Sequence, residues 1–261
     1  MKGNPIRGGS YLLRGAAMLP QPGIRHFVLV PLLINLLLFV AAIWLLVQQF
    51  TYWVDYGLGR LPEWAGFLYW LFWPLFALLV IGGVYYGFSI VANLIAAPFN
   101  GFLAEKVEQQ LRGAPLVDEG WKAVLAMIPR SLQREVQKLA YYLPRFLLLL
   151  IVTFIPGLNL VAPVLWFLFG AWMMSIQYCD YPMDNNKVSF AQMKQLMKAR
   201  RVTSIGFGGL VQLGMLVPVL NLFLMPAAVV GATIFWVEEY AGQVREVNGG
   251  AAPPAGRGSG N

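Results

Sequence analysis

The feature that most constrains the fold is a set of long runs without any charged side chain. The first, FVLVPLLINLLLFVAAIWLLV, covers residues 27–47. As a helix it would span about 31 Å, which matches a hydrocarbon core of about 30 Å. Only 12% of the residues are charged, against roughly 25% in a soluble domain. The chain is therefore predicted to be an all-α integral membrane protein, whose spanning segments satisfy their own backbone hydrogen bonds.

A second apolar stretch, residues 67–99, is longer than one crossing requires. As a straight helix it would measure about 50 Å. We therefore expect it to tilt, to bend near Gly82 and Gly83, or to project beyond the bilayer. Residues 27–47 and 67–99 are predicted to be the two long transmembrane helices.

Two further uncharged runs, residues 146–179 and 202–237, are broken in the middle by FIPGLNLVAP and LVPVLNLFLMP. Each run is too short for two crossings with a turn, which need more than about 40 residues. A single helix would have to accommodate proline and glycine at its centre. We expect two re-entrant helical hairpins, at about 143–179 and 202–237, which enter the membrane without crossing it.

The distribution of charge supports this topology. Lys and Arg concentrate in residues 1–26, 100–145 and 187–201, whereas residues 48–66 contain only Arg60. Because basic loops stay on the cytoplasmic side, the three basic segments share one side and both hairpins return to it. Topology and anionic lipid headgroups explain the net charge of +7, so no nucleic-acid partner is predicted.

The two predicted hairpin tips resemble each other. Residues 156–160 (PGLNL) match residues 218–222 (PVLNL), and Pro163 and Pro226 follow them. Two interpretations stay open: a weak internal repeat of the kind that builds transport pathways, or the common use of Pro and Asn in turns. In either case the tips must be buried in protein or face a water-filled cavity, because lipid cannot form hydrogen bonds with the free N–H and C=O groups of a turn.

The remaining organisation is simple. We predict a single helical membrane domain, residues 1–240, with a polar helical segment at 100–142 and a disordered tail at 247–261. A single cysteine, Cys179, and a single histidine, His26, exclude an internal disulfide and histidine clusters. No catalytic motif or nucleotide-binding loop is recognisable. We therefore predict no cofactor, no metal site and no enzymatic activity.

The stretch QPGIRHF, just before the first spanning helix, has the character of an anion site. Pro22 and Gly23 interrupt the chain where a helix begins, and the first N–H groups of a helix carry a partial positive charge. Gly23 would let the backbone approach an anion. Arg25 adds a forked, permanently charged donor, and His26 adds another when protonated. The alternative is an ordinary basic flank, which these residues alone favour.

Several stretches resemble the CysZ family of bacterial sulfate permeases. They are SYLLRG at 10–15, PGIRHFVLVPLLIN at 22–35, NLIAAPFNGFLAEKVE at 93–108 and QYCDYPMDN at 177–185, within a likeness that covers nearly all of residues 8–240. The resemblance implies sulfate uptake across the inner membrane for cysteine synthesis, by oligomers of a fold with two spanning helices and membrane-dipping hairpins. It also implies a sulfate site at Gly23, Ile24, Arg25 and His26, with backbone N–H donors from Gly23 and Ile24.

The chain departs from the family pattern at His26, where a second arginine is common. The fixed charge is then smaller near neutral pH, so we expect sulfate binding to tighten as the imidazole becomes protonated. A polar path would need neutral donors that replace water. The candidates, each of which also has a capping or helix-bridging interpretation, are Asn35, Asn93, Asn100, Asn159 and Asn221.

Two acidic residues, Glu105 and Glu108, lie one helical turn apart and would repel sulfate. We read them as a solvated helix face, or as a gate on the path, or as partners of Lys106 or Arg112. The predicted partners are sulfate (or sulfite and related oxyanions), membrane lipid and further copies of the chain. The competing function is that of a non-transporting membrane scaffold or accessory protein, which would need no arginine at the start of a helix.

Overall fold

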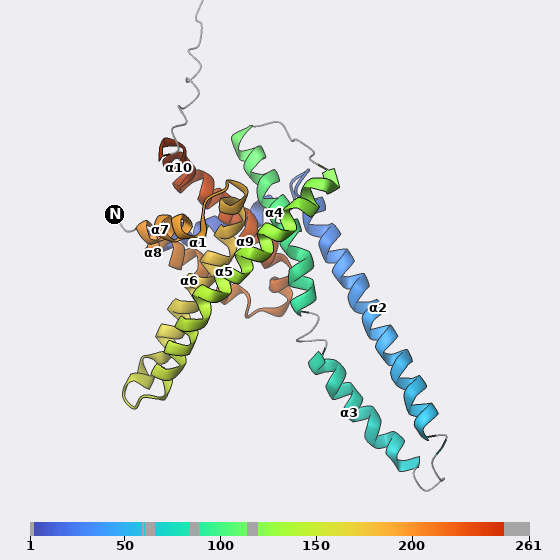
Figure 1. Ribbon diagram of the computed structural model, residues 1–261. Coiled ribbons are helices and arrows are strands. Elements are labelled where there is room, and N and C mark those ends of the chain that lie inside the picture. The colour runs from blue at the N-terminus through green and yellow to red at the C-terminus, as the bar shows by residue number, and fades with distance from the viewer. Residues whose placement is uncertain (1–2, 59, 61–65, 84–88, 114–119, 248–261) are drawn as a thin grey trace, which may run out of the picture. The chain divides into compact units, whose positions relative to one another are not determined.

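The computed structural model describes residues 3–58, 60, 66–83, 89–113 and 120–247, and every regular element within these ranges is helical (Figure 1). The all-α prediction is thus confirmed, whereas most of the predicted tail, residues 248–261, lies outside the described residues. The helices are α1 (Pro5–Met18), α2 (Arg25–Leu58), α3 (Phe67–Gly83), α4 (Ser89–Arg112), α5 (Gly120–Phe154), α6 (Ala162–Asn185), α7 (Phe190–Ala199), α8 (Arg201–Gly214), α9 (Pro218–Glu239) and α10 (Ala241–Val247), with a short 3₁₀ helix, η3 (Leu158–Leu160).

The chain divides into two compact units, which we describe separately. One unit is Leu29–Phe99, and the other combines Met1–Val28 with Asn100–Asn261. In the Leu29–Phe99 unit, α2 and α3 pack through aromatic rings. Phe50 stacks on Phe76 at 3.6 Å between ring centroids and meets Trp73 edge-on at 5.0 Å. The predicted transmembrane segment 67–99 is divided between α3, which ends at Gly83, and α4, which begins at Ser89. A bend near Gly82 and Gly83 was one of the three alternatives that the sequence left open.

The far end of α2 has the features of a membrane–water interface. Tyr52, Trp53 and Tyr56 are all exposed there, and the Arg60 guanidinium lies 4.1 Å from the centre of the Tyr56 ring. Aromatic and basic side chains of this kind collect at headgroup level. α2 therefore extends eleven residues beyond the uncharged run that ended at residue 47.

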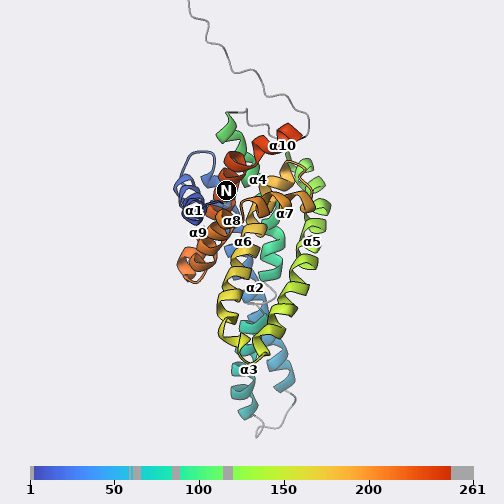
Figure 2. The same ribbon diagram turned by 90° about the vertical axis from the view of Figure 1, so that its left-hand side faces the viewer.

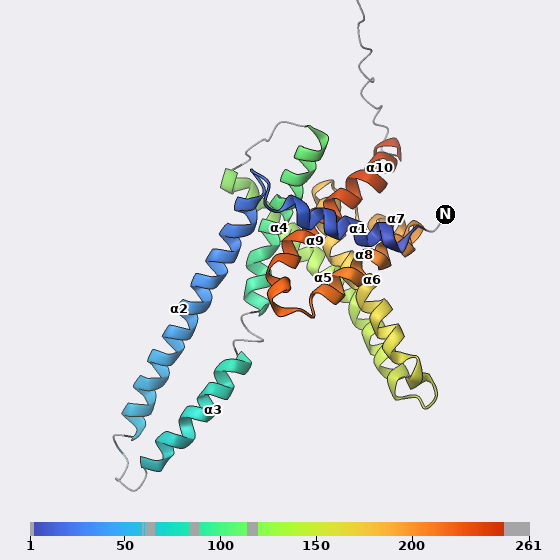
Figure 3. The ribbon, with the colours of Figure 1, turned by 180° about the vertical axis from the view of Figure 1, so that it is seen from behind.

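In the larger unit, α1 lies across α8 and α9 (Figure 3). Asn4 caps this helix by accepting a hydrogen bond from the N–H of Ile6, and Pro5 occupies its first turn. Glycines allow the close approach: a side chain at Gly8 would clash with the backbone of Thr203, and one at Gly15 with that of Ala227. Close packing through small residues is typical of membrane helices. The sequence analysis did not predict this helix.

The first predicted hairpin is formed by α5 and α6, which lie side by side (Figure 2). α5 passes through Pro129 and Pro144 without ending. The chain then turns at the predicted PGLNL segment, where Gly157 has a φ of +84°, a conformation that favours glycine. The polar segment predicted at 100–142 is divided between α4 and α5.

The second hairpin, α8–α9, turns slightly earlier than the sequence predicted. The turn is at residues 215–217, and Pro218 begins α9. Proline is favourable in the first helical turn because its missing N–H needs no partner there. The matched segments 156–160 and 218–222 thus have different backbone conformations, which favours the turn-former interpretation over an internal repeat.

Three described stretches are long and apolar enough to cross a membrane, namely Leu36–Gly57, Ser131–Phe154 and Ala162–Asn185. The first lies on α2, and the other two lie on the arms of the α5–α6 hairpin. Many large apolar side chains on α2 and on the hairpin are exposed. The chain is a membrane protein.

Candidate functional site

The four residues of the predicted anion site lie where α1 connects to α2: Gly23 and Ile24 end the turn, and Arg25 and His26 begin α2. Gly23 has a φ of +91°, and a side chain there would meet no atom within 4 Å. Glycine is therefore favoured here by backbone conformation rather than by crowding. The N–H groups of Ile24 and Arg25 both donate to the carbonyl oxygen of Gln21, at 3.1 and 3.2 Å. The Ile24 N–H, predicted as a sulfate donor, is thus already hydrogen-bonded.

The side chains of this turn separate into an anchor and two exposed donors. Ile24 is 1% exposed and belongs, with Val28, to the core of the larger unit. Arg25 and His26 are exposed. Across the described part of the chain, no hydrogen bond or ion pair engages either side chain. Arg25 and His26 therefore present exposed nitrogen donors, and the neighbouring Ile24 anchors the backbone that carries them in the core.

The end of α4 lies beside this turn. The Gln110 side-chain amide donates to the Gln21 side-chain oxygen at 3.0 Å. Within the two preceding turns of α4, Leu103, Ala104 and Val107 belong to the same buried core as Ile24. The acidic pair predicted on α4 is therefore positioned by the same core that anchors the Arg25 turn.

Glu108 has partners on three elements and is only 8% exposed. Its carboxylate pairs with Arg112 at 2.6 Å and accepts hydrogen bonds from the Asn186 side chain at 2.7 Å and the Trp236 indole at 3.1 Å. Buried carboxylates need such partners. Pairing with Arg112, one of the alternatives for the acidic residues, is confirmed for Glu108, whereas its burial shows that the solvated-face interpretation is wrong for this residue. Glu108 connects α4 to the end of α6 and to α9.

Other predicted path residues occupy varied positions. Glu105 accepts a hydrogen bond from the Gln109 side chain at 3.0 Å. Asn100 donates to the Tyr181 hydroxyl at 3.3 Å and so bridges α4 and α6. Asn159 is exposed at the tip of the α5–α6 hairpin, within η3. The side chains of Asn35, Asn93 and Asn221 lie outside those that the structure describes.

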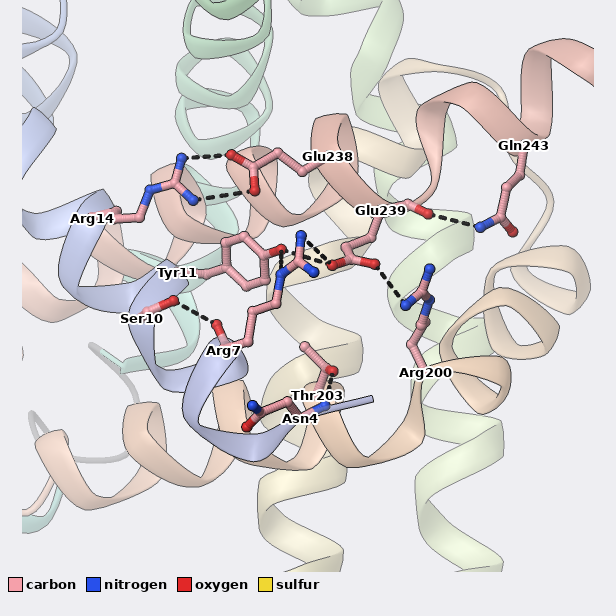
Figure 4. Close-up of polar contacts among 10 residues, drawn as sticks. All are labelled: Asn4, Arg7, Ser10, Tyr11, Arg14, Arg200, Thr203, Glu238, Glu239 and Gln243. Carbon is pink, nitrogen blue, oxygen red and sulfur yellow. Dashed lines mark hydrogen bonds and ion pairs between the residues drawn. The ribbon is translucent and has the colours of Figure 1, made fainter. Parts of the chain in front are cut away.

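A carboxylate cluster that the sequence analysis missed holds α1 in place (Figure 4). Glu239, at the end of α9, has a side chain that is 4% exposed, and it pairs with Arg7 at 2.9 Å and with Arg200 at 3.1 Å. The Tyr11 hydroxyl donates to the same carboxylate at 3.0 Å. Burial, followed by this hydrogen bond, raises the pKa of Tyr11 well above its ordinary value.

The neighbouring Glu238 forms a second link. Arg14 donates to both of its carboxylate oxygens, at 2.6 and 3.2 Å (Figure 4), and these bonds lower the pKa of Glu238. Arg7, Tyr11 and Arg14 follow one another at spacings of four and three residues, so they share one face of α1. The sequence therefore held a signal for this contact: three polar side chains on one helical face near the N-terminus, and two adjacent glutamates, Glu238 and Glu239, directly after the last uncharged run.

Comparisons with known proteins identify the family. A family model described as "Sulfate transporter CysZ/Etoposide-induced protein 2.4" matches residues 11–226. A protein of Pseudomonas paraeruginosa named "Sulfate transporter CysZ" is 52% identical over 235 residues, covering 90% of this chain and 96% of the relative. One of the same name from Pectobacterium atrosepticum is 50% identical over 234 residues, covering 89% and 85%. The chain therefore belongs to the Sulfate transporter CysZ/Etoposide-induced protein 2.4 family.

Proposed function

We propose that this chain transports sulfate across the bacterial inner membrane and supplies it for cysteine synthesis. The observation that carries the proposal is the match to proteins named "Sulfate transporter CysZ" at about half identity over nine-tenths of the chain. No catalytic role is proposed, and sulfite or related oxyanions are candidate alternative cargoes.

The proposed entry site is the α1–α2 turn. Arg25 is exposed and has no partner among the described residues, so its guanidinium is available for two parallel hydrogen bonds to a tetrahedral oxyanion. His26, next to it, adds a second charge when protonated. The Gly23 N–H is the backbone donor that we retain, because the Ile24 N–H donates to Gln21.

The proposed topology is two long spanning helices and two re-entrant hairpins, in a multi-pass protein that assembles as a homo-oligomer. Support comes from the uncharged residues 146–179 of the α5–α6 hairpin, which lie between Arg145 and Asp180, and from the basic segments at both ends of that hairpin. We extend the re-entrant assignment to α8–α9 because its first arm, Arg201–Gly214, has only 14 residues, a length of about 21 Å.

Cysteine labelling tests the topology. A membrane-impermeant thiol reagent should label Gln133→Cys and Lys187→Cys from the same side of an inverted vesicle, and Arg60→Cys from the opposite side. The native Cys179 is buried, so it should contribute little background. Labelling of positions 133 and 187 from opposite sides would contradict a hairpin that returns to its side of entry.

Uptake of radiolabelled sulfate into liposomes tests the function itself. We expect the purified protein to admit sulfate at a rate well above that of protein-free liposomes. The competing function, a non-transporting scaffold, predicts equal rates for the two. The rate for Arg25→Ala then tests the entry site separately from transport. Loss of uptake supports an entry site at Arg25, whereas unchanged uptake would mean that Arg25 is only a basic residue flanking the helix.

A further inference from the structure

Two positive charges meet at one aromatic ring near the base of the α5–α6 hairpin. The Arg145 guanidinium lies 3.6 Å from the centre of the Tyr141 ring, and the Lys194 ammonium, on α7, lies 4.9 Å from the same centre. Lys194 also lies 4.7 Å from the centre of the Phe190 ring. Each cation is attracted by the ring, but the two charges repel each other. An anion bound close to both cations would relieve that repulsion.

The described part of the chain supplies no such anion. Arg145 donates to the backbone carbonyl of Tyr141 at 2.6 Å, and neither Arg145 nor Lys194 pairs with a described carboxylate. The Trp172 indole N–H donates to the Tyr141 hydroxyl at 3.2 Å. The hydroxyl hydrogen of Tyr141 has no acceptor among the described residues. The cluster thus offers three donor groups to a ligand that carries negative charge.

The position of the cluster indicates which anion it meets. Arg145 is the last charge before the uncharged run at 146–179, so it marks the edge of the hydrocarbon region. Leu148, one helical turn further, is 63% exposed, and Ile151 is 60% exposed. An acyl chain can lie against these side chains while its headgroup remains beside Arg145. Free phosphate or sulfate would gain nothing from that apolar face.

The sequence around α7 adds a wider basic surface. Residues 187–201 contain five Lys and Arg and no acidic residue. Lys198 and Arg201 are both exposed. Each basic side chain near a membrane surface contributes about 1 kcal/mol of attraction to anionic lipid. α7 lies at the open end of the α5–α6 hairpin, away from its tip (Figure 1). Its Lys194 and the Arg145 guanidinium lie 4.9 and 3.6 Å from the centre of the same Tyr141 ring, so this basic surface adjoins Arg145.

We propose that Arg145, Lys194 and Tyr141 form a binding site for the headgroup phosphate of an anionic phospholipid. The two cations hold the phosphate, the Tyr141 hydroxyl donates to it, and the exposed face of α5 after Arg145 receives an acyl chain. This site is separate from the Arg25 turn and does not depend on sulfate transport.

Native mass spectrometry of the full-length protein, titrated with phosphatidylglycerol in detergent, tests the site. The Arg145→Gln/Lys194→Gln double variant should bind this lipid about thirtyfold more weakly, since two basic contacts are lost. The matched control, Lys198→Gln/Arg201→Gln, removes two exposed cations of the same basic surface that do not contact the Tyr141 ring, and it should weaken this binding by a clearly smaller factor than the double variant at positions 145 and 194. Tyr141→Phe, which keeps the ring, should weaken binding by a smaller factor.

Two measurements on the parent protein test the lipid site even if a variant does not fold. Phosphatidylcholine, which has a phosphate but no net charge, should bind at least about tenfold more weakly than phosphatidylglycerol. A large excess of inorganic phosphate should not displace phosphatidylglycerol. Equal binding of both lipids, ready displacement by phosphate, or undiminished binding in a folded double variant would each overturn the lipid site.

Discussion

The two helical hairpins of the larger unit have similar apolar sequences but opposite surroundings. In α8–α9, the interior of α9 is closed off by α1, and Ala228, Val229 and Val230 have no exposed surface. At the tip of α5–α6, by contrast, Phe154 and Leu160 are 78% and 82% exposed. Hydrophobicity alone does not distinguish these two environments.

The difference lies in the residues that allow close approach. α1 reaches α8 and α9 because glycines occur on both sides of the contact, including Gly8, Gly15 and Gly231. The distal part of α5–α6 has large side chains and no such partner. The first hairpin is therefore shaped for contact with lipid or other chains, and the second for contact with the helix that carries the Arg25 turn.

The largest expected effect is at the glycine contact. Gly15→Leu should destabilise the protein by at least about 3 kcal/mol, because the new side chain meets the backbone of α9 and neither helix can yield without moving. Thermal unfolding in detergent measures this. Gly242→Leu is the matched control, since no atom lies within 4 Å of a side chain there. Equal melting temperatures for the two variants would show that α1 does not pack as described.

A smaller loss is expected from the Glu239 cluster. Glu239→Gln removes the charge that Arg7 and Arg200 share and should cost about 2 kcal/mol, less than a fully buried pair because both arginines can still reach water. The adjacent Glu238→Gln affects a pair whose side chains are 49% and 35% exposed, so it should cost less than about 1 kcal/mol. A reversed order would contradict the assignment of Glu239 as the main contact of α1.

The Glu238 pair also predicts a dependence on pH. Its pKa is lowered in the folded protein by the hydrogen bonds from Arg14. Its contribution to stability is therefore full above the ordinary carboxyl value of 4.5 and is lost as pH falls through the lower folded value. The difference in melting temperature between parent and Glu238→Gln should shrink on acidification below that value. If the difference in melting temperature instead grew on acidification, the pKa of Glu238 would not be lowered in the folded protein.

How far the sequence predicts this molecule depends on the kind of signal. Uncharged runs and prolines located α2 and the α5–α6 turn, but the single spanning segment predicted at 67–99 is divided between α3 and α4. They misplaced the second turn, because Pro218 begins a helix instead of ending one. α1 was missed, because its glycines lower helix propensity and its stability depends on tertiary contacts.

The candidate site shows the same division. Local patterns predict an anion site at Gly23, Arg25 and His26, and this assignment stays a prediction. They could not show that the Ile24 N–H is engaged by Gln21. Nor could they show that Glu239 gathers side chains from α1 and from the start of α8, since such contacts join residues far apart in the sequence.

The smallest effect is expected at the first hairpin tip. Leu160→Ser should change the melting temperature in detergent by little, because a substitution at so exposed a side chain costs within about 0.5 kcal/mol. Leu224→Ser, at a 6% exposed position on α9, should be clearly destabilising. The pair is compared in the same unfolding experiment. Similar losses for both would remove the contrast between the hairpins.

Calorimetric titration of sulfate into the purified protein tests the central claim most directly. We expect the parent to bind sulfate and Arg25→Ala to bind it about ten- to a hundredfold more weakly, as loss of one charge-assisted contact predicts. Lys198→Ala, which removes an exposed cation away from the turn, should bind like the parent. Equal affinities for the parent and Arg25→Ala would contradict an anion site at the start of α2.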